Sequence, residues 1–324
     1  MAHLVEHMAY TGVTPWHGLG QKLPANRPLE EWIVSAGMNW KINEAPVLFD
    51  CNALPNSSTL RLPLTREAQG NKVLYRSDTH APLSVVSHRY QVVQPKAIME
   101  FYRDLTEQFG FEMETAGVLK GGRKLWALAK TGQSTQVRGN DTVNGYVLLA
   151  TACDGTMATT AQFTSVRVVC NNTLSIATRD STGAVKVPHS TPFDALAVKQ
   201  KLGLTVSKWD EFSYQLKALS DRKLTDRNVT RFLSSLFDGH NTALSVKARE
   251  RNQAAILNLY QGNGMGAQLA SAHNTAFGLL NAVTQFVDHE QRAHSNDNRL
   301  NSAWFGQGAK LKNRAFENAM ALVA

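Results

Sequence analysis

The sequence predicts an α+β fold, with a helix and an antiparallel β-meander as its core and a mostly α-helical C-terminal region. Three observations support this prediction. Apolar residues recur at helical spacing directly after Pro95, alternating runs separated by short turns follow, and helical periodicity dominates beyond Pro192. The strands are expected to be antiparallel, because turns of two residues cannot form the crossover that a parallel pair needs.

The length of the chain favours two domains. The protein has 324 residues, and single hydrophobic cores stop growing near roughly 250–300 residues. A strand and a linker precede the helical pattern near residue 190. The predicted domains are therefore an α+β domain with an extended N-terminal segment over 1–190 and a helical domain over 191–324.

The N-terminal segment is expected to contain one short helix and several short strands. Pro28 pre-sets the backbone for a helix over Leu29–Ala36. The first turn of that helix carries Glu30 and Glu31, and the helix dipole favours acids at this end. Short apolar runs between polar turns predict three strands, at Val73–Tyr75, Leu83–Val86 and Tyr90–Val93.

The central segment predicts one helix followed by two β-hairpins. Apolar residues recur at helical spacing over Ile98–Phe109, and Gly110 stands where a helix commonly ends. Turn sequences at 121–122 and 154–155 separate alternating runs. The predicted strands are Phe111–Val118, Lys124–Lys130, Val143–Cys153 and Met157–Phe163.

The C-terminal region is predicted to consist of helices. Trp304 and Phe305 are candidates for the core or for self-association. The basic cluster of Lys310, Lys312 and Arg314 is either a solvated helix face or an addition to affinity for nucleic acid. The predicted helices are Phe193–Leu219, Asn228–Leu236, Leu244–Leu259, Gln268–His289 and Gly308–Leu322.

The composition indicates a globular protein with an acidic partner. Hydrophobic residues make up 43% and charged residues 19% of the chain, which argues against disorder. The formal net charge of +8 favours nucleic acid as a partner. Cys51, Cys153 and Cys170 include no CxxC pair and fit a reducing compartment. Without a membrane-spanning run or a signal-peptide pattern, we expect a cytoplasmic protein with no membrane partner.

The clearest chemical signal is a basic hairpin. Residues 115–140 contain five Lys or Arg and no acid, and the strand period of two places Lys124, Trp126 and Lys130 on one face. We expect the cations to neutralise phosphates and Trp126 to stack a base, as single-stranded DNA binding requires. An ordinary solvated hairpin, with Trp126 covering the edge of the core, is the alternative. The candidate residues are Lys120, Arg123, Lys124, Trp126, Lys130 and Arg138.

The segment after the fourth predicted strand supplies further candidates. The planar guanidinium of Arg167 can clamp phosphate oxygens, and Asn171 and Asn172 can hydrogen-bond bases or sugars. Cys170 is either a nucleophile with His189 as its base or a buried core residue. The buried interpretation is favoured, because free cysteine is among the most buried residue types.

No catalytic residue, metal site or cofactor is predicted. Glycine-rich loops at 16–20 and 262–266 lack the strand, helix and Lys-Ser/Thr context of nucleotide-binding loops. The ten histidines include no His-Glu-x-x-His pattern. Asp288 and Arg292 are spaced as i,i+4 partners on a helix, which predicts a surface ion pair and not a metal ligand.

Four motifs resemble those of the phage/plasmid-like protein family, which carries a domain of unknown function. They are Thr14–Gly20, Arg167–Leu174, Asn281–His289 and Ser302–Gly306, and they are spread over nearly the whole chain. The resemblance implies a mobile genetic element in a bacterial host and no established reaction. The order of helix, hairpin, longer strands and helix is similar, at fold level only, to the Rad52-like single-strand annealing proteins, which form oligomers on single-stranded DNA.

We therefore expect a non-enzymatic protein of a phage or plasmid that binds single-stranded DNA as a homo-oligomer and can anneal it. Two alternatives stay open. One is a protein-directed factor whose partner is a host protein, such as a defence or repair enzyme that it inhibits. The other is an enzyme of unknown reaction, either of the Cys-His type or a metal-dependent nuclease.

Overall fold

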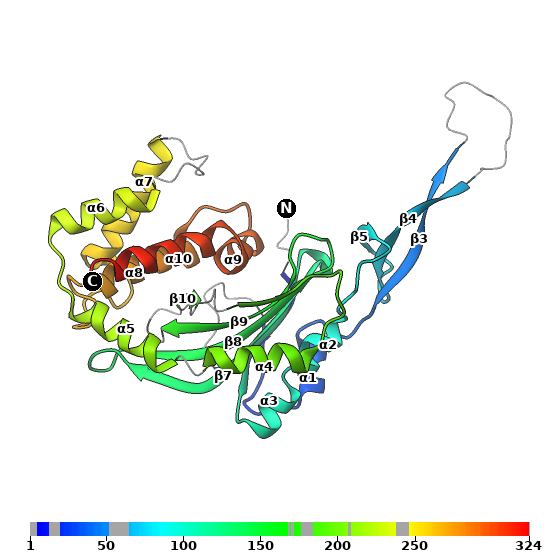
Figure 1. The fold of residues 1–324 in the computed structure, drawn as a ribbon, viewed down its shortest axis with the longest axis horizontal. Helices are drawn as coiled ribbons and strands as arrows, with labels where there is room; N and C mark the ends of the chain where they lie inside the picture. The colour runs from blue at the N-terminus through cyan, green and yellow to red at the C-terminus, as the bar shows by residue number, and fades with distance from the viewer. Residues whose placement is uncertain are drawn as a thin grey trace.

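The computed structural model describes residues 5–12, 20–51, 65–167, 169, 172–175, 184–206, 209–237 and 246–323. Its fold is α+β, as the sequence predicts, with two sheets in the first part of the chain and helices in the last part. Helices cover both faces of the larger sheet, and a narrow β-structure projects away from this body (Figure 1).

The larger sheet contains the predicted antiparallel meander. Its strand order is β10-β9-β8-β7-β6-β1-β2, and β11 pairs with the free part of β9. The neighbours β6, β7, β8 and β9 are consecutive in the chain and antiparallel, so the prediction of two linked hairpins is confirmed. The bounds of the strands are β1 Val5–Tyr10, β2 Gln21–Lys22, β6 Glu112–Leu119, β7 Lys124–Gln136, β8 Thr142–Ala152, β9 Thr159–Arg167, β10 Asn172–Ser175 and β11 Ala184–Val187.

Helices lie on both faces of this sheet (Figure 1). Because successive residues of a strand point to opposite faces, β7 is apolar on both sides. Leu125 and Ala127 belong to the large core that includes α2, and Trp126 and Leu128 belong to a second cluster with Leu300 of α9. One face is covered by α1 Leu29–Ser35, α2 Pro95–Glu100, α3 Arg103–Gln108 and α4 Ala195–Val206, and the other by α8 Ala276–Gln285, α9 Asn296–Phe305 and α10 Gln307–Met320.

Two predicted helices are interrupted. The segment Ile98–Phe109 forms α2 and α3 with a break at Phe101 and Tyr102, both of which are buried. The Tyr102 hydroxyl donates to the carbonyl oxygen of Ala127, in β7, at 2.7 Å. The residues at the break thus connect α2 and α3 to the sheet. The predicted helix Phe193–Leu219 is likewise divided into α4 and α5.

The remaining helices form the rest of the C-terminal region. One hydrophobic cluster contains residues from both sides of residue 190, for example Ala127 and Phe316, so the two predicted regions share a core. No helix in the described ranges has the length and apolar character needed to cross a bilayer. The further elements are α5 Trp209–Asp221, α6 Asp226–Phe237, α7 Val246–Asn258 and the short π-helical turns η2 Leu259–Asn263 and η3 Phe286–Glu290.

The projecting structure is a second sheet with the order β3-β4-β5. Its strands are β3 Ile42–Asp50, β4 Thr65–Arg76 and β5 Pro82–Ser87. The base of this sheet is fixed to the body. The side-chain amide of Gln94 donates to the carbonyl oxygen of Ile42 at 3.0 Å and accepts from its N–H at 2.9 Å, and Leu74 is fully buried.

Candidate nucleic-acid interface

The predicted basic hairpin has a tight turn at its tip. The turn η1, Lys120–Gly122, connects β6 to β7, and we call residues 120–124 the basic turn. Lys120, Gly121 and Gly122 have φ of 54°, 70° and 102°. At Gly122 a side chain is also excluded by packing, because a Cβ there would lie 3.0 Å from the Trp40 ring. The sequence Lys-Gly-Gly thus fits a turn that presses its backbone against the base of the projecting sheet.

The basic turn carries three cations and no carboxylate. Arg123 is exposed and Lys120 is half-buried. Lys124 is buried and donates to Oδ1 of Asn301, in α9, at 2.5 Å. Burial lowers the pKa of Lys124, and the positive charge of Lys120 lowers it further, while Asp154 acts in the opposite direction. The like charges at this turn therefore destabilise one another.

No described carboxylate forms an ion pair with the cations of the basic turn. The nearby Asp154 accepts hydrogen bonds from the backbone N–H of Thr156 at 3.1 Å and from its hydroxyl at 2.5 Å. Asp154 therefore stabilises the β8–β9 turn and forms no ion pair with Arg123. The basic turn thus carries positive charge that no described ion pair neutralises, and Arg123 is its exposed cation.

The prediction that Trp126 stacks a base is wrong. Trp126 is only 2% exposed, and its ring meets that of Trp304 edge-to-face, with the centroids 5.0 Å apart. The strand period correctly placed Lys124 and Trp126 on one face. That face is covered by α9, so neither side chain is open to a base. Of the two interpretations, base stacking and packing in the core, the structure shows that Trp126 packs in the core.

The prediction that Arg167 clamps phosphate is also wrong. Its guanidinium is buried and donates to both carboxylate oxygens of Asp141, from Nε to Oδ1 at 2.9 Å and to Oδ2 at 3.1 Å, and from Nη2 to Oδ2 at 2.7 Å. It also donates to the carbonyl oxygen of Gly266 at 3.1 Å, and the hydroxyl of Ser271 donates to Asp141. The charge of Arg167 is therefore paired inside the protein by Asp141. Such pairing is needed, since burial of an unpaired guanidinium would be very costly.

Lys130 and Arg138 do not join the basic turn. Lys130 lies six residues along β7 from Lys124, which corresponds to ~20 Å in an extended strand. It is half-buried. Burial raises the pKa of Glu114, and the charge of Lys130 offsets only part of that rise. Arg138 lies beyond the far end of β7 and is 3.9 Å from Asp221. The nine candidate residues therefore do not form one surface.

The asparagine and cysteine candidates can be placed only in part. Asn171 and Cys170 lie outside the described residues. Asn172 is described by its backbone, which begins β10 and pairs with Arg167 of β9. The loop that includes Trp16 and His17 also lies outside the described residues.

A second buried ion pair was not predicted. Nζ of Lys312, in α10, is 2.6 Å from Oδ1 of Asp288, in η3, and 2.7 Å from Oγ1 of Thr173, in β10. The i,i+4 spacing predicts a surface ion pair between Asp288 and Arg292, but Asp288 is buried and its partner is Lys312. The same finding corrects the view of Lys312 as a solvated or DNA-binding cation. The only sequence signal was the close succession of an acid and basic residues, which does not identify partners.

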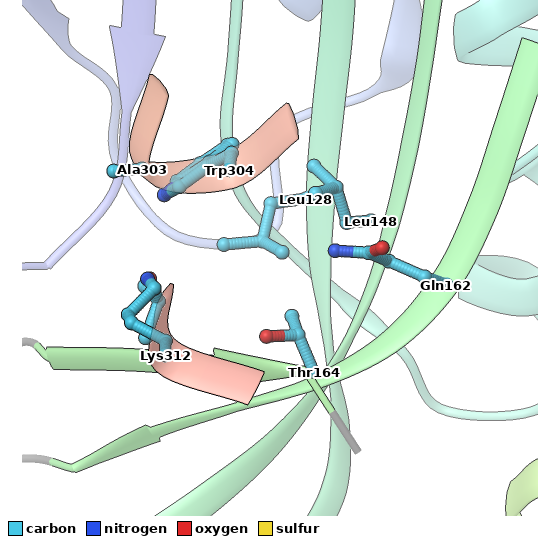
Figure 2. A pocket seen from close by; sticks show the side chains of 8 residues that line it. Leu128, Leu148, Gln162, Thr164, Ala303, Trp304 and Lys312 are labelled. Carbon is cyan, nitrogen blue, oxygen red and sulfur yellow. The ribbon is translucent and has the colours of Figure 1, made fainter. Parts of the chain in front are cut away.

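A small cavity lies beside this ion pair (Figure 2). Lys312, Thr164, Gln162 and Trp304 surround it, with leucine side chains of the sheet between them. The space open to water-sized molecules is about 10 Å³, enough for about one water and far below the roughly 300–1,000 Å³ of a small-molecule site. This cavity does not accommodate a nucleotide.

The candidates for enzyme chemistry are a metal cluster, a reactive thiol and a histidine base. The described residues contain no group of three or more His, Cys, Asp or Glu that could hold a metal ion. Burial, and then the charge of Asp154, raises the pKa of Cys153 to about 12, so its thiol stays protonated at neutral pH. Both ring nitrogens of His189 face backbone carbonyl oxygens, those of Gln91 at 2.9 Å and Met157 at 3.2 Å.

Comparison with known proteins identifies one domain. The family model described as "Domain of unknown function (DUF932)" matches residues 82–304. This match runs from β5 into α9, so it includes the basic turn, Trp126 and Asp288 but neither β3, β4 nor Lys312. No curated protein and no solved structure matches the chain. Because the match covers more than half of its residues, the chain belongs to the DUF932 family, whose function is unknown.

Proposed function

We propose that this protein binds nucleic acid by contacting backbone phosphates with the basic turn. The observation that carries the proposal is the group of three cations, Lys120, Arg123 and Lys124, that no described carboxylate neutralises. Burial is the main cause of the lowered pKa of Lys124, and the positive charge of Lys120 adds to it. A phosphate at this turn would offset that second contribution. Arg123 is the principal contact, because its planar guanidinium matches two phosphate oxygens.

The burial of Trp126 limits the proposal to the phosphate backbone. The expected preference of the protein for single-stranded DNA depended on base stacking by Trp126. That side chain is buried and is covered by Trp304. Phosphate contacts position a protein on nucleic acid and carry no base-sequence information, so the proposed binding is independent of sequence. An origin in a phage or plasmid, and strand annealing, are proposals that rest on resemblance alone.

The test measures binding of the full chain to a labelled oligonucleotide by fluorescence anisotropy over a range of salt concentrations. The decisive variant combines Lys120→Glu with Arg123→Glu. We expect affinity to fall about a hundredfold or more, since each of the two contacts to a charged group contributes about 1.5–3 kcal/mol. The matched control combines Lys201→Glu with Lys217→Glu, exposed lysines of α4 and α5 that change the net charge equally. This control should retain most of the affinity.

Salt dependence supplies an independent readout. Two lost phosphate contacts should make the slope of log K against log salt shallower by about 1.4 for a single strand and about 1.8 for a duplex. Equal binding by the wild type and the double variant would remove the basic turn from the proposal. An absence of binding at low salt, together with nuclease-resistant copurification of a host protein, would favour the protein-directed alternative.

A further inference from the structure

The outer part of the projecting sheet has only two strands. The pairing of β5 with β4 ends at Asn71 opposite Ser87, so β5 does not reach the outer half of β4. We call residues 48–50 and 65–70 the outer arm. It extends away from the body (Figure 1), and an isolated two-stranded ribbon is at best marginally stable in water. The outer arm is therefore expected to gain stability from a partner.

The outer arm has two chemically different faces. Leu48 lies opposite Glu67, and Phe49 lies opposite Arg66. Residues directly opposite each other share a face, and successive residues point to opposite faces. One face thus carries Leu48 and Glu67, which we call the acidic face, and the other carries Phe49 and Arg66, which we call the basic face. Leu48 is 59% and Phe49 50% exposed, so each face presents an uncovered apolar side chain next to charge. The basic face has Arg66, and the acidic face has Glu67 together with Asp50, which follows Leu48 by two positions on the same strand.

Two charges of the outer arm, those of Arg66 and Glu67, differ from the paired charges at its base. At the base, Lys72 lies 2.8 Å from Glu44, and Arg76 lies 2.7 Å from Asp78. Neither Arg66 nor Glu67 forms an ion pair with any residue that the structure describes. The two faces lie on opposite sides of one ribbon, so a single chain cannot bring them together.

We propose that the outer arms of two copies of this chain stack, with the basic face of one copy on the acidic face of the other. The contact joins Phe49 to Leu48 and Arg66 to Glu67, so apolar surface is covered and both charges are paired. Nucleic acid fits this surface poorly, because one face carries a carboxylate. A contact between two different faces leaves one of each free at the ends, so it extends into a ring or a row of copies.

The test exploits charge reversal on the full chain, without nucleic acid, so that its outcome is separate from that of the basic turn. Association is measured by sedimentation velocity over a range of concentrations. Arg66→Glu leaves both faces acidic, and Glu67→Arg places a cation opposite Arg66 at the contact while Asp50 stays. Each variant alone should therefore associate at least about tenfold more weakly than the wild type. A one-to-one mixture of the two variants restores opposite charges at every contact and should associate again. The chain carrying both substitutions should also associate.

The matched control is Lys201→Glu, a charge reversal on the exposed surface of α4, which should leave association unchanged. Circular dichroism of each variant verifies that the body is folded, and all substituted side chains are exposed. A wild-type chain that stays monomeric at high concentration overturns the proposal. Association that ignores the single reversals, or that fails to return in the mixture, overturns it as well.

Discussion

The basic turn and the β9–β10 hairpin use the same kind of residue in opposite ways. At the hairpin, Arg167 and the neighbouring Lys312 are buried against Asp141 and Asp288. At the basic turn, Arg123 points to solvent with no carboxylate partner among the described residues. Both regions looked basic in the sequence. A cation is available to a ligand only where no internal acid has already paired with it, and that distinction is set by tertiary structure.

The largest expected effect comes from breaking the pairing at the hairpin. Asp141→Asn removes the carboxylate and leaves the guanidinium of Arg167 buried without a counter-charge. Loss of one partner of a buried pair typically costs about 3–5 kcal/mol. We expect this loss in the free energy of unfolding, measured by urea denaturation with circular dichroism.

A paired replacement controls for this result. Arg167→Met combined with Asp141→Leu removes both charges and retains apolar volume, and such replacements are often neutral. The double variant should therefore be more stable than Asp141→Asn alone. If the single variant unfolds like the wild type, the buried ion pair does not stabilise the hairpin.

A smaller effect comes from giving the basic turn an internal partner. Asn301→Asp places a carboxylate where Lys124 now binds an amide oxygen at 2.5 Å. We expect a gain of at most about 1 kcal/mol in stability, since partly solvated ion pairs contribute little. Affinity for an oligonucleotide should fall a few-fold, although Arg123 and Lys120 are unchanged. Asn301→Gln, which adds no charge, is the control. An affinity equal to that of the wild type would show that the net charge of the turn does not govern binding.

The smallest effect concerns an ion pair at the base of the projecting sheet. Hydrogen bonds from Arg76 lower the pKa of Asp78 from 3.8 to about 2. Because the folded pKa lies below the unfolded one, this pair stabilises the fold above about pH 3.8, and the contribution is lost as the pH falls toward 2. Asp78 is partly exposed, so the effect should stay within about 1 kcal/mol. The guanidinium of Arg76 lies 4.3 Å from the centroid of the Trp40 ring, so the fluorescence of Trp40 should change when Arg76 moves.

Tryptophan fluorescence, recorded as the pH falls, measures the separation of Arg76 from Asp78. The difference between the wild type and Trp40→Phe isolates the contribution of Trp40 from that of the other tryptophans. Asp78→Asn should abolish the acid-dependent part of that difference. An unchanged transition in Asp78→Asn would assign it to other carboxylates.

Local patterns in the sequence were sufficient for the fold class. The period of two correctly assigned the faces of β7, and the short turns correctly predicted the antiparallel meander. Breaks within helices were missed, because the hydroxyl of Tyr102 binds a carbonyl oxygen in a different element. Such a contact leaves no periodic signal near Tyr102.

The candidate site was harder to predict, because its decisive contacts are distant in sequence. Lys124 and its partner Asn301 are separated by 177 positions, and Lys312 and its partner Thr173 by 139. No local pattern around Trp126 shows that Trp304 covers it. The place of Arg123 at the turn was predicted correctly, because Gly121 and Gly122 mark the connection between two strands. Its contact with phosphate stays a proposal.

The cover that α9 and α10 provide also has a consequence during synthesis. Ribosomes add roughly 5–20 residues per second, so the strands that carry Trp126 and Leu148 emerge on the order of ten seconds before Trp304. Throughout that interval one face of the nascent sheet is apolar and uncovered. The unfinished chain is then a substrate for chaperones that hold apolar segments, and release should follow completion of α9.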